Sequence, residues 1–131
     1  MGAMDFSPAL VEFWAERHLC TVTTLRPDGT PHVVPMGVVL DPDAGAAWAI
    51  TSRHSRKVRN VSSAGGGAPI AVCQVDGRRW STLEGTARVL TTAEEVEEAE
   101  RRYAARYKVP RENPDRVALH NSVTRLLGNV R

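Results

Sequence analysis

Tight-turn signals recur along this sequence and cut it into short segments rich in Val, Ile and Thr. Residues 26–29 (RPDG) and 41–45 (DPDAG) combine Pro, which presets φ, with Asp, which bonds its own backbone, and Gly, which accepts positive φ. Residues 76–77 form an Asp-Gly pair, which is typical of a two-residue hairpin turn. Segments joined by such turns pair as antiparallel hairpins, so the chain is predicted to be mainly β.

The segments between the turns predict six strands and three helices. Within residues 79–90, apolar and polar side chains alternate, and Gly85 is expected to mark a bulge. The helices are expected from Ser7 to about residue 17, over residues 55–64, and from a capping box at Thr92. This set indicates a β-barrel with peripheral helices. The expected strands are residues 19–25, 31–40, 46–52, 70–75, 79–90 and 116–127.

The length of 131 residues fits one domain, which we expect to span residues 5–131 after a leader introduced by cloning at residues 1–4 (MGAM). The longest apolar run, residues 33–40, is far shorter than the roughly 20 residues that cross a bilayer. Without a signal peptide or membrane segment, the chain is expected in the cytoplasm and not at a membrane. The net charge of +2 gives no indication of nucleic-acid binding.

The sequence contains no motif for an activated nucleophile or a metal centre. Cys20 and Cys73 each stand alone in apolar segments, so we expect two free thiols, and the four histidines are scattered. The glycines at 65–67 follow a helix, whereas a dinucleotide fingerprint follows a strand. If the protein is an enzyme, a cofactor is expected to supply the reactive atoms.

The strongest candidate for a binding site is the segment at residues 51–60 (TSRHSRKVRN), where a strand ends and a helix begins. Ser55, Arg56 and Lys57 stand at that helix start. An anion there would meet unpaired amides, hydroxyls and cations together, which favours a phosphate site. The plain alternative is a Ser cap followed by a solvated basic face.

A second candidate lies beside the Asp-Gly turn, where Arg78, Arg79 and Trp80 combine cations with a large aromatic surface. The plain alternative is a hairpin tip with a half-buried Trp. Gln74 is polar within an apolar run. It either faces solvent or offers a donor and an acceptor to the edge of a heterocycle.

Four segments together resemble the split β-barrel family of pyridoxamine-phosphate oxidase, and within it the actinobacterial branch of flavin/deazaflavin oxidoreductases that uses coenzyme F420. They read HLCTVTTLRPDGTPHVVPMGVVLD, ITSRHSRKVRN, VCQVDGRRWSTLEGTARV and AERRYAARYKVPRENP. The resemblance extends from about residue 17 to residue 128. It implies a six-stranded antiparallel split β-barrel of the FMN-binding type and a homodimer with two cofactor sites at the subunit interface.

The resemblance also implies a set of cofactor-binding residues and no catalytic or metal-binding side chain. By this resemblance, one strand would pass beside the deazaflavin ring and ribityl chain with His32, Val33, Val34, Pro35 and Met36. Thr51 and Ser52 would lie near the ring and the chain. The phosphate and the start of the glutamate tail would be held by Ser55, Arg56, Lys57 and Asn60. The same groove would be lined by Gln74, Arg78, Arg79 and Trp80, some of them from the other subunit.

The activity implied by the resemblance is hydride transfer from reduced F420 to a small conjugated acceptor, with biliverdin, reduced to bilirubin, as the first candidate. F420 and FMN both carry a ring, a ribityl chain and a phosphate, so an FMN-dependent oxidoreductase or oxidase is the alternative on the same barrel. A third possibility is a non-catalytic module that carries a flavin, F420 or haem.

Overall fold

The computed structural model describes residues 5–131, and the leader predicted at residues 1–4 lies outside the described residues. Three helices and seven strands make up the described part. The helices are α1 (Pro8–Ala15), α2 (Arg56–Ser63) and α3 (Ala93–Arg106). The strands are β1 (Cys20–Leu25), β2 (Pro31–Met36), β3 (Val39–Asp41), β4 (Ala46–Ser52), β5 (Ala68–Asp76), β6 (Arg79–Leu90) and β7 (Arg116–Gly128).

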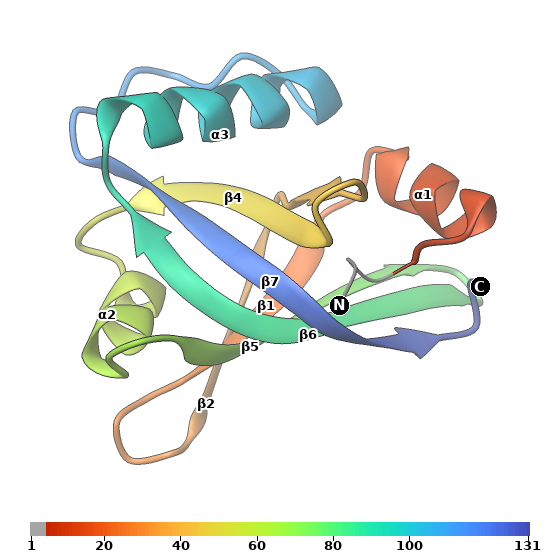
Figure 1. Ribbon diagram of the computed structural model, residues 1–131, viewed down its shortest axis with the longest axis horizontal. Helices are drawn as coiled ribbons and strands as arrows, with labels where there is room; N and C mark the ends of the chain where they lie inside the picture. The colour runs from red at the N-terminus through yellow and green to blue at the C-terminus, as the bar shows by residue number, and fades with distance from the viewer. Residues whose placement is uncertain (1–4) are drawn as a thin grey trace.

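The strands form a single antiparallel sheet in the order β2-β1-β5-β6-β7-β4-β3. The two edge strands, β2 and β3, follow each other in the chain and are separated only by Gly37 and Val38. The sheet must therefore curl until its two edges come close together, as its folded-over outline in Figure 1 shows. The result is a barrel that stays open between β2 and β3, which confirms the split-barrel prediction.

The structure has seven strands instead of six because the expected strand at 31–40 breaks at Gly37. A Cβ at Gly37 would lie 2.8 Å from the ring of Tyr107 and 3.0 Å from that of Tyr103, so these two rings fill the space beside it. The Tyr107 hydroxyl accepts a hydrogen bond from the Val38 N–H at 3.2 Å and donates to the His18 carbonyl at 2.7 Å. The Val38 amide is thus bonded to a side chain and not to a strand, which ends the ladder.

The helices begin at the residues that the sequence predicts. Ser7 caps α1, with Pro8 as its first residue, and Ser55 caps α2. Thr92 and Glu95 form the expected capping box of α3. In Figure 1, α2 and α1 lie toward opposite ends of the sheet and α3 lies over β4. None of the helices in the described part of the chain is long and apolar enough to cross a membrane.

The core fills the inside of the curled sheet. Val22, Val72 and Leu83 from three neighbouring strands are almost fully buried, together with Phe13 and Trp14 of α1. The Trp14 Nε1–H donates to the Ser81 hydroxyl at 2.9 Å, which fixes α1 to β6.

A bulge interrupts the pairing of β6 with β7 beside Gly85. Glu84 pairs with Arg125 and Gly85 with Val123, so the extra residue is Thr124 of β7 and does not belong to β6, where the bulge was predicted. A Cβ at position 85 would lie 2.0 Å from the Ser122 carbonyl oxygen. Glycine is therefore required here by the close approach of β7.

Candidate functional site

The start of α2 gathers hydroxyls and free amides at the end of β4. Ser55 lies at the N-cap, where its hydroxyl oxygen accepts from the Val58 N–H at 3.4 Å and from the Thr51 hydroxyl at 3.3 Å. The Ser55 N–H donates to the Ser52 carbonyl at 3.1 Å. The three predicted residues Thr51, Ser52 and Ser55 therefore come together around one tight turn.

The first turn of α2 is basic, with no acidic residue. Within residues 5–131, neither Arg56 nor Lys57 forms an ion pair, whereas Arg53 lies 3.7 Å from Asp115. Cations at a helix N-terminus oppose the helix dipole, each at a cost of about 0.3–1 kcal/mol. This arrangement is unfavourable for the free protein and becomes favourable when an anion binds between the cations and the free amides.

The positive charge extends to the neighbouring edge strand. His32 of β2 has a lowered pKa, first because of partial burial and then because of the positive charges of Arg26, Lys57 and Arg56. Burial also lowers the pKa of Lys57. The three cations Arg26, Arg56 and Lys57 are called the cation cluster below, and His32, whose lowered pKa favours the neutral imidazole, lies beside them. A cluster with this much uncompensated charge attracts anions.

Two buried polar atoms with no protein partner lie beside the cation cluster. Asn60 is 2% exposed, and its Nδ2 donates to the Thr24 hydroxyl at 3.0 Å, but its Oδ1 has no partner. His32, which pairs with Thr24 in the β1–β2 ladder, has an unpartnered Nδ1. Because buried polar atoms normally have hydrogen-bond partners, this region has spare capacity for a ligand that carries hydroxyls.

The strand β2 presents its residues in alternation. His32, Val34 and Met36 are partly buried, whereas Val33 and Pro35 face outward. Among the strands of residues 5–131, the edge strand β2 pairs with β1 alone, so the backbone groups on its other side are open to a ligand. The predicted residues 32–36 therefore form one accessible strand that begins at the cation cluster.

Gln74 does not line a groove of this chain, in contrast to its predicted position. It is fully buried, its Nε2 donates to the Phe13 carbonyl at 2.8 Å, and its Oε1 accepts from Arg106. Both ends of its amide are thus used to hold α1 and α3 on β5. The sequence showed a polar residue in an apolar strand but could not show that its partners come from two distant helices.

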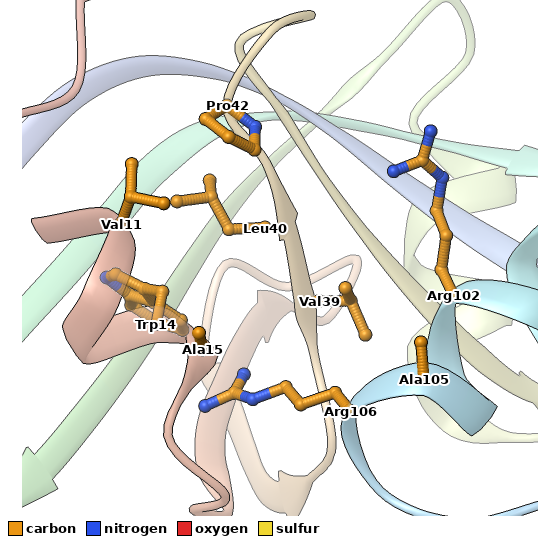
Figure 2. Close-up of a pocket in the computed structure, with 9 residues that line it drawn as sticks. All are labelled: Val11, Trp14, Ala15, Val39, Leu40, Pro42, Arg102, Ala105 and Arg106. Carbon is orange, nitrogen blue, oxygen red and sulfur yellow. The ribbon is translucent and has the colours of Figure 1, made fainter. Parts of the chain in front are cut away.

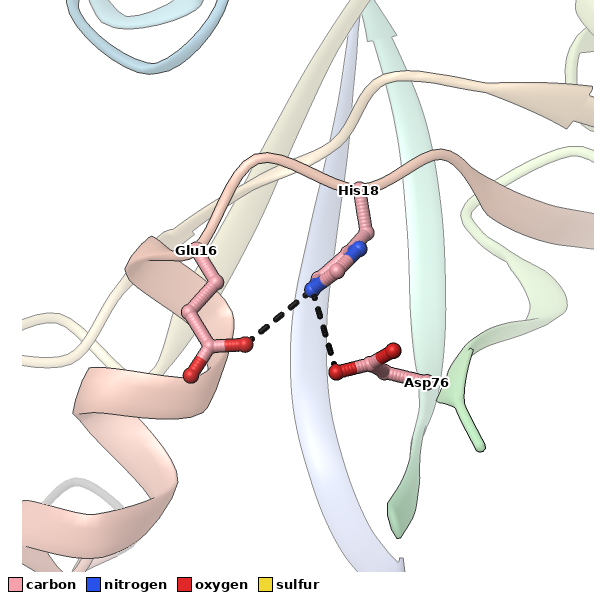
Figure 3. A group of neighbouring side chains, drawn as sticks. All are labelled: Glu16, His18 and Asp76. Atoms are coloured by element: carbon pink, nitrogen blue, oxygen red, sulfur yellow. Dashed lines mark hydrogen bonds and ion pairs between the residues drawn. The ribbon is translucent and has the colours of Figure 1, made fainter. Parts of the chain in front are cut away.

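Arg79 belongs to a surface ion network and is not free for a ligand of its own chain. It pairs with both oxygens of Glu16 at 2.9 and 2.8 Å and also with Asp76. Figure 3 shows His18 between the same two carboxylates, with its Nε2 3.0 Å from Glu16 and 3.7 Å from Asp76. Arg79, followed by His18, lowers the pKa of Glu16 to about 2. Because Arg79 bonds to both carboxylates and His18 lies between them, we interpret this group as a salt-bridge network.

The hairpin turn that carries Arg78, Arg79 and Trp80 lies far from α2. The strand β5 runs from Ala68, just after α2, to Asp76, and its nine residues span about 30 Å. Figure 1 shows this hairpin and α2 at opposite ends of the sheet. One chain therefore does not bring the two predicted groups together.

A cavity of about 190 Å³ lies between α1 and α3 (Figure 2), but its polar groups are already engaged. Arg106 donates to the Glu16 and Val38 carbonyls, and Arg102 lies 3.2 Å from Asp41. We therefore interpret this cavity as a gap in the packing between α1 and α3.

The sequence interpretation missed a larger groove, of about 600 Å³, at the far end of β2. Met36 and Ile50 contribute to its apolar wall, and Lys108 and Arg111 come from the segment between α3 and β7. The signal available in the sequence was the basic segment at residues 108–111 (KVPR), which contains Pro110 between two cations.

The curled antiparallel sheet, with a basic helix start beside an edge strand, defines a split β-barrel protein with a positively charged end. The model of the pyridoxamine 5'-phosphate oxidase family matches residues 6–128. The chain therefore belongs to the pyridoxamine 5'-phosphate oxidase family.

Similarity to individual proteins agrees with this assignment. The chain is 46% identical over 119 residues to the F420H(2)-dependent biliverdin reductase of Mycobacterium tuberculosis, which covers 90% of this chain and 84% of that protein. The crystal structure of the conserved hypothetical protein Rv2991 from Mycobacterium tuberculosis superimposes with a TM-score of 0.77, at 21% identity, over 98% of this chain and 87% of the other. An F420 reductase structure gives a TM-score of 0.70 at 20% identity over 88% and 94%. These two structures have the same fold.

Proposed function

We propose that this protein is an F420-dependent reductase that transfers a hydride from reduced F420 to a small conjugated acceptor, with biliverdin as the best candidate. The observation that carries the proposal is the cation cluster, whose Arg56 and Lys57 form no ion pair within residues 5–131 and which lies beside the edge strand β2. The name of the relative that is 46% identical specifies F420 and biliverdin.

The residues at this end of the barrel fit the phosphate and ribityl chain of F420. We assign the phosphate to Ser55, Arg56 and Lys57, where amides, a hydroxyl and two unpaired cations meet. The unpartnered Asn60 Oδ1 and His32 Nδ1 have capacity for ribityl hydroxyls. From His32 to Met36, the strand β2 extends for about 13 Å, which suits a ribityl chain followed by a ring. Thr51 and Ser52 lie at the same end.

When bound, reduced F420 supplies the hydride, and the acceptor gains one hydride and one proton. The part of the chain in this reaction is to hold two flat molecules in contact and to exclude water. Tyr107 is not a proton donor candidate, because its hydroxyl already donates to the His18 carbonyl and burial raises its pKa to about 12. We therefore assign no catalytic side chain.

We also propose that the protein acts as a homodimer, in which Arg78 and Trp80 of one copy complete the site of the other, while Arg79 remains bonded to Glu16 and Asp76. Trp80 is 39% exposed and lies opposite Val75, which is 59% exposed. Leu127, on the adjoining end of β7, is 41% exposed. A second copy would cover this apolar strip and bring its hairpin toward α2. Sedimentation of the purified protein should give twice the chain mass, and a monomer at micromolar concentration would contradict this proposal.

The proposed function is tested by titrating the protein with F420 and FMN in parallel and following the fluorescence of each cofactor. The expected result is tighter binding of F420, together with oxidation of reduced F420 when biliverdin is added and formation of bilirubin at 1:1 stoichiometry. Preference for FMN would identify the protein as an FMN-dependent member of the family. Tight F420 binding without turnover of biliverdin, quinones or enones would indicate a carrier.

A further inference from the structure

The groove of about 600 Å³ lies between the end of β2, β4 and the segment that joins α3 to β7. Its volume falls in the range of pockets for ligands of drug size, about 300–1,000 Å³. Seven of its ten lining residues are apolar or aromatic, and the other three are basic. The apolar and aromatic residues are Leu19, Met36, Gly37, Ile50, Tyr103, Val109 and Pro110.

Three cations line this groove, and two of them have no charge partner. Arg116 lies 2.9 Å from Glu100, so its charge is neutralised. Lys108 and Arg111 are exposed, and across the described residues 5–131 neither forms an ion pair. Leu19 and Val109 are 66% and 81% exposed, which leaves apolar surface in water beside the two free cations. Such a surface matches a flat apolar molecule with negatively charged side chains.

The groove opens at the end of β2 that is farther from the cation cluster. Met36, the last residue of β2, lines the groove, whereas His32 lies beside Arg56 and Lys57. In F420, the phosphate and the ring are at opposite ends of the ribityl chain, and the glutamate tail is attached on the phosphate side. A cofactor with its phosphate at the cation cluster would therefore direct its ring, and not its tail, toward the groove.

We propose that this groove is the acceptor site and that Lys108 and Arg111 bind carboxylates of the acceptor. This inference rests on the proposed function and names the acceptor class as a conjugated, planar molecule that carries carboxylates. Lys108 and Arg111 are binding residues in this proposal and take no part in hydride or proton transfer.

The test is a binding measurement on protein saturated with oxidised F420, in which no turnover occurs. Biliverdin and its dimethyl ester, which lacks the two negative charges, are titrated by visible absorption against the wild type and a Lys108→Ala, Arg111→Ala double variant. A matched control removes two exposed arginines elsewhere, Arg101→Ala with Arg125→Ala, so that the net charge changes equally.

The expected result is about tenfold weaker binding of biliverdin by the double variant, because two exposed ion pairs at about 0.7 kcal/mol each amount to one factor of ten. The control variant should bind biliverdin as the wild type does. The dimethyl ester should bind equally to the wild type and to the double variant. F420 affinity should be the same in all three proteins.

Two results would overturn the inference while leaving the proposed function intact. In the first, the double variant binds biliverdin as tightly as the wild type does. In the second, the double variant loses as much affinity for the dimethyl ester as for biliverdin. Weaker F420 binding by the double variant would assign the groove to the glutamate tail and also overturn it. Failure of the wild type to bind F420 would overturn the proposed function itself.

Discussion

Replacing both Arg56 and Lys57 with Ala should change cofactor affinity and protein stability in opposite directions. Each charge-assisted hydrogen bond to a phosphate contributes about 1.5–3 kcal/mol. Lys57 is half-buried and Arg56 is partly exposed, so we take values toward the lower end and expect a total loss of about 3–4 kcal/mol. This corresponds to F420 binding that is weaker by a factor of about 100–1,000.

The same double variant should be more stable without ligand. Both cations lie in the first turn of α2, where they oppose the dipole, and both contribute to the lowered pKa of His32. Removing them should increase the free energy of unfolding by about 1 kcal/mol, or raise the Tm by roughly 4 °C for a domain of this size. Weaker F420 binding together with higher stability is expected if the two cations serve ligand binding. If they had a structural role, their removal would lower the stability.

The assays are a fluorescence titration with F420 and thermal unfolding of the free protein, with Arg59→Ala as the control. Arg59 is an exposed cation on the same helix and should leave F420 affinity within about twofold of the wild type, as a surface charge outside the site would. Unchanged affinity in the double variant would refute the phosphate assignment. A lower Tm would refute the argument that these cations are unfavourable in the free protein.

Three further predictions concern the frame that holds the site. Tyr107→Phe should lower the free energy of unfolding, measured by urea titration, by about 1–3 kcal/mol, because it leaves the Val38 amide without its partner. Tyr103→Phe, the control, should lower it by less than about 0.5 kcal/mol. Gly85→Ala should lower stability by about 1–3 kcal/mol or prevent folding, because its Cβ would lie 2.0 Å from a β7 carbonyl oxygen, and a normal Tm would contradict the bulge geometry. Glu16 has a folded pKa of about 2, below its ordinary value of 4.5, so its contribution to stability is present above pH 4.5 and is lost as the pH falls toward 2. Arg79→Ala should raise this pKa in a carboxyl NMR titration, and an unmoved pKa would contradict the assignment of Arg79 as its main cause.

The parts of the fold that the sequence predicted depend on neighbouring residues. The turn at residues 26–29 needs only Pro, Asp and Gly in order, and Gly29 indeed has a φ of +88°. The cap at Ser55 and the box of Thr92 with Glu95 each form within one helical turn. The start of α2, with its cap and its basic first turn, could therefore be predicted from local sequence alone.

The parts that the sequence could not predict depend on contacts between distant segments. The break after Met36 is caused by Tyr107, which lies about 70 residues later and accepts from Val38. The burial of Gln74 depends on Phe13 and Arg106, which belong to α1 and α3. The alternation of apolar and polar residues within one strand gives no information about partners in distant segments.

Separate long-range hydrogen bonds lie near each of the two ends of β2. At the cation cluster, Asn60 bonds to Thr24 and holds α2 against β1 at 3.0 Å. At the groove, Tyr107 bonds to Val38 and to the carbonyl of His18, next to Leu19. Because the two anchors share no residue, Asn60→Ala should weaken F420 binding with little effect at the groove, and Tyr107→Phe should weaken biliverdin binding more than F420 binding. Equal losses of both ligands in either variant would mean that β2 moves as one rigid unit.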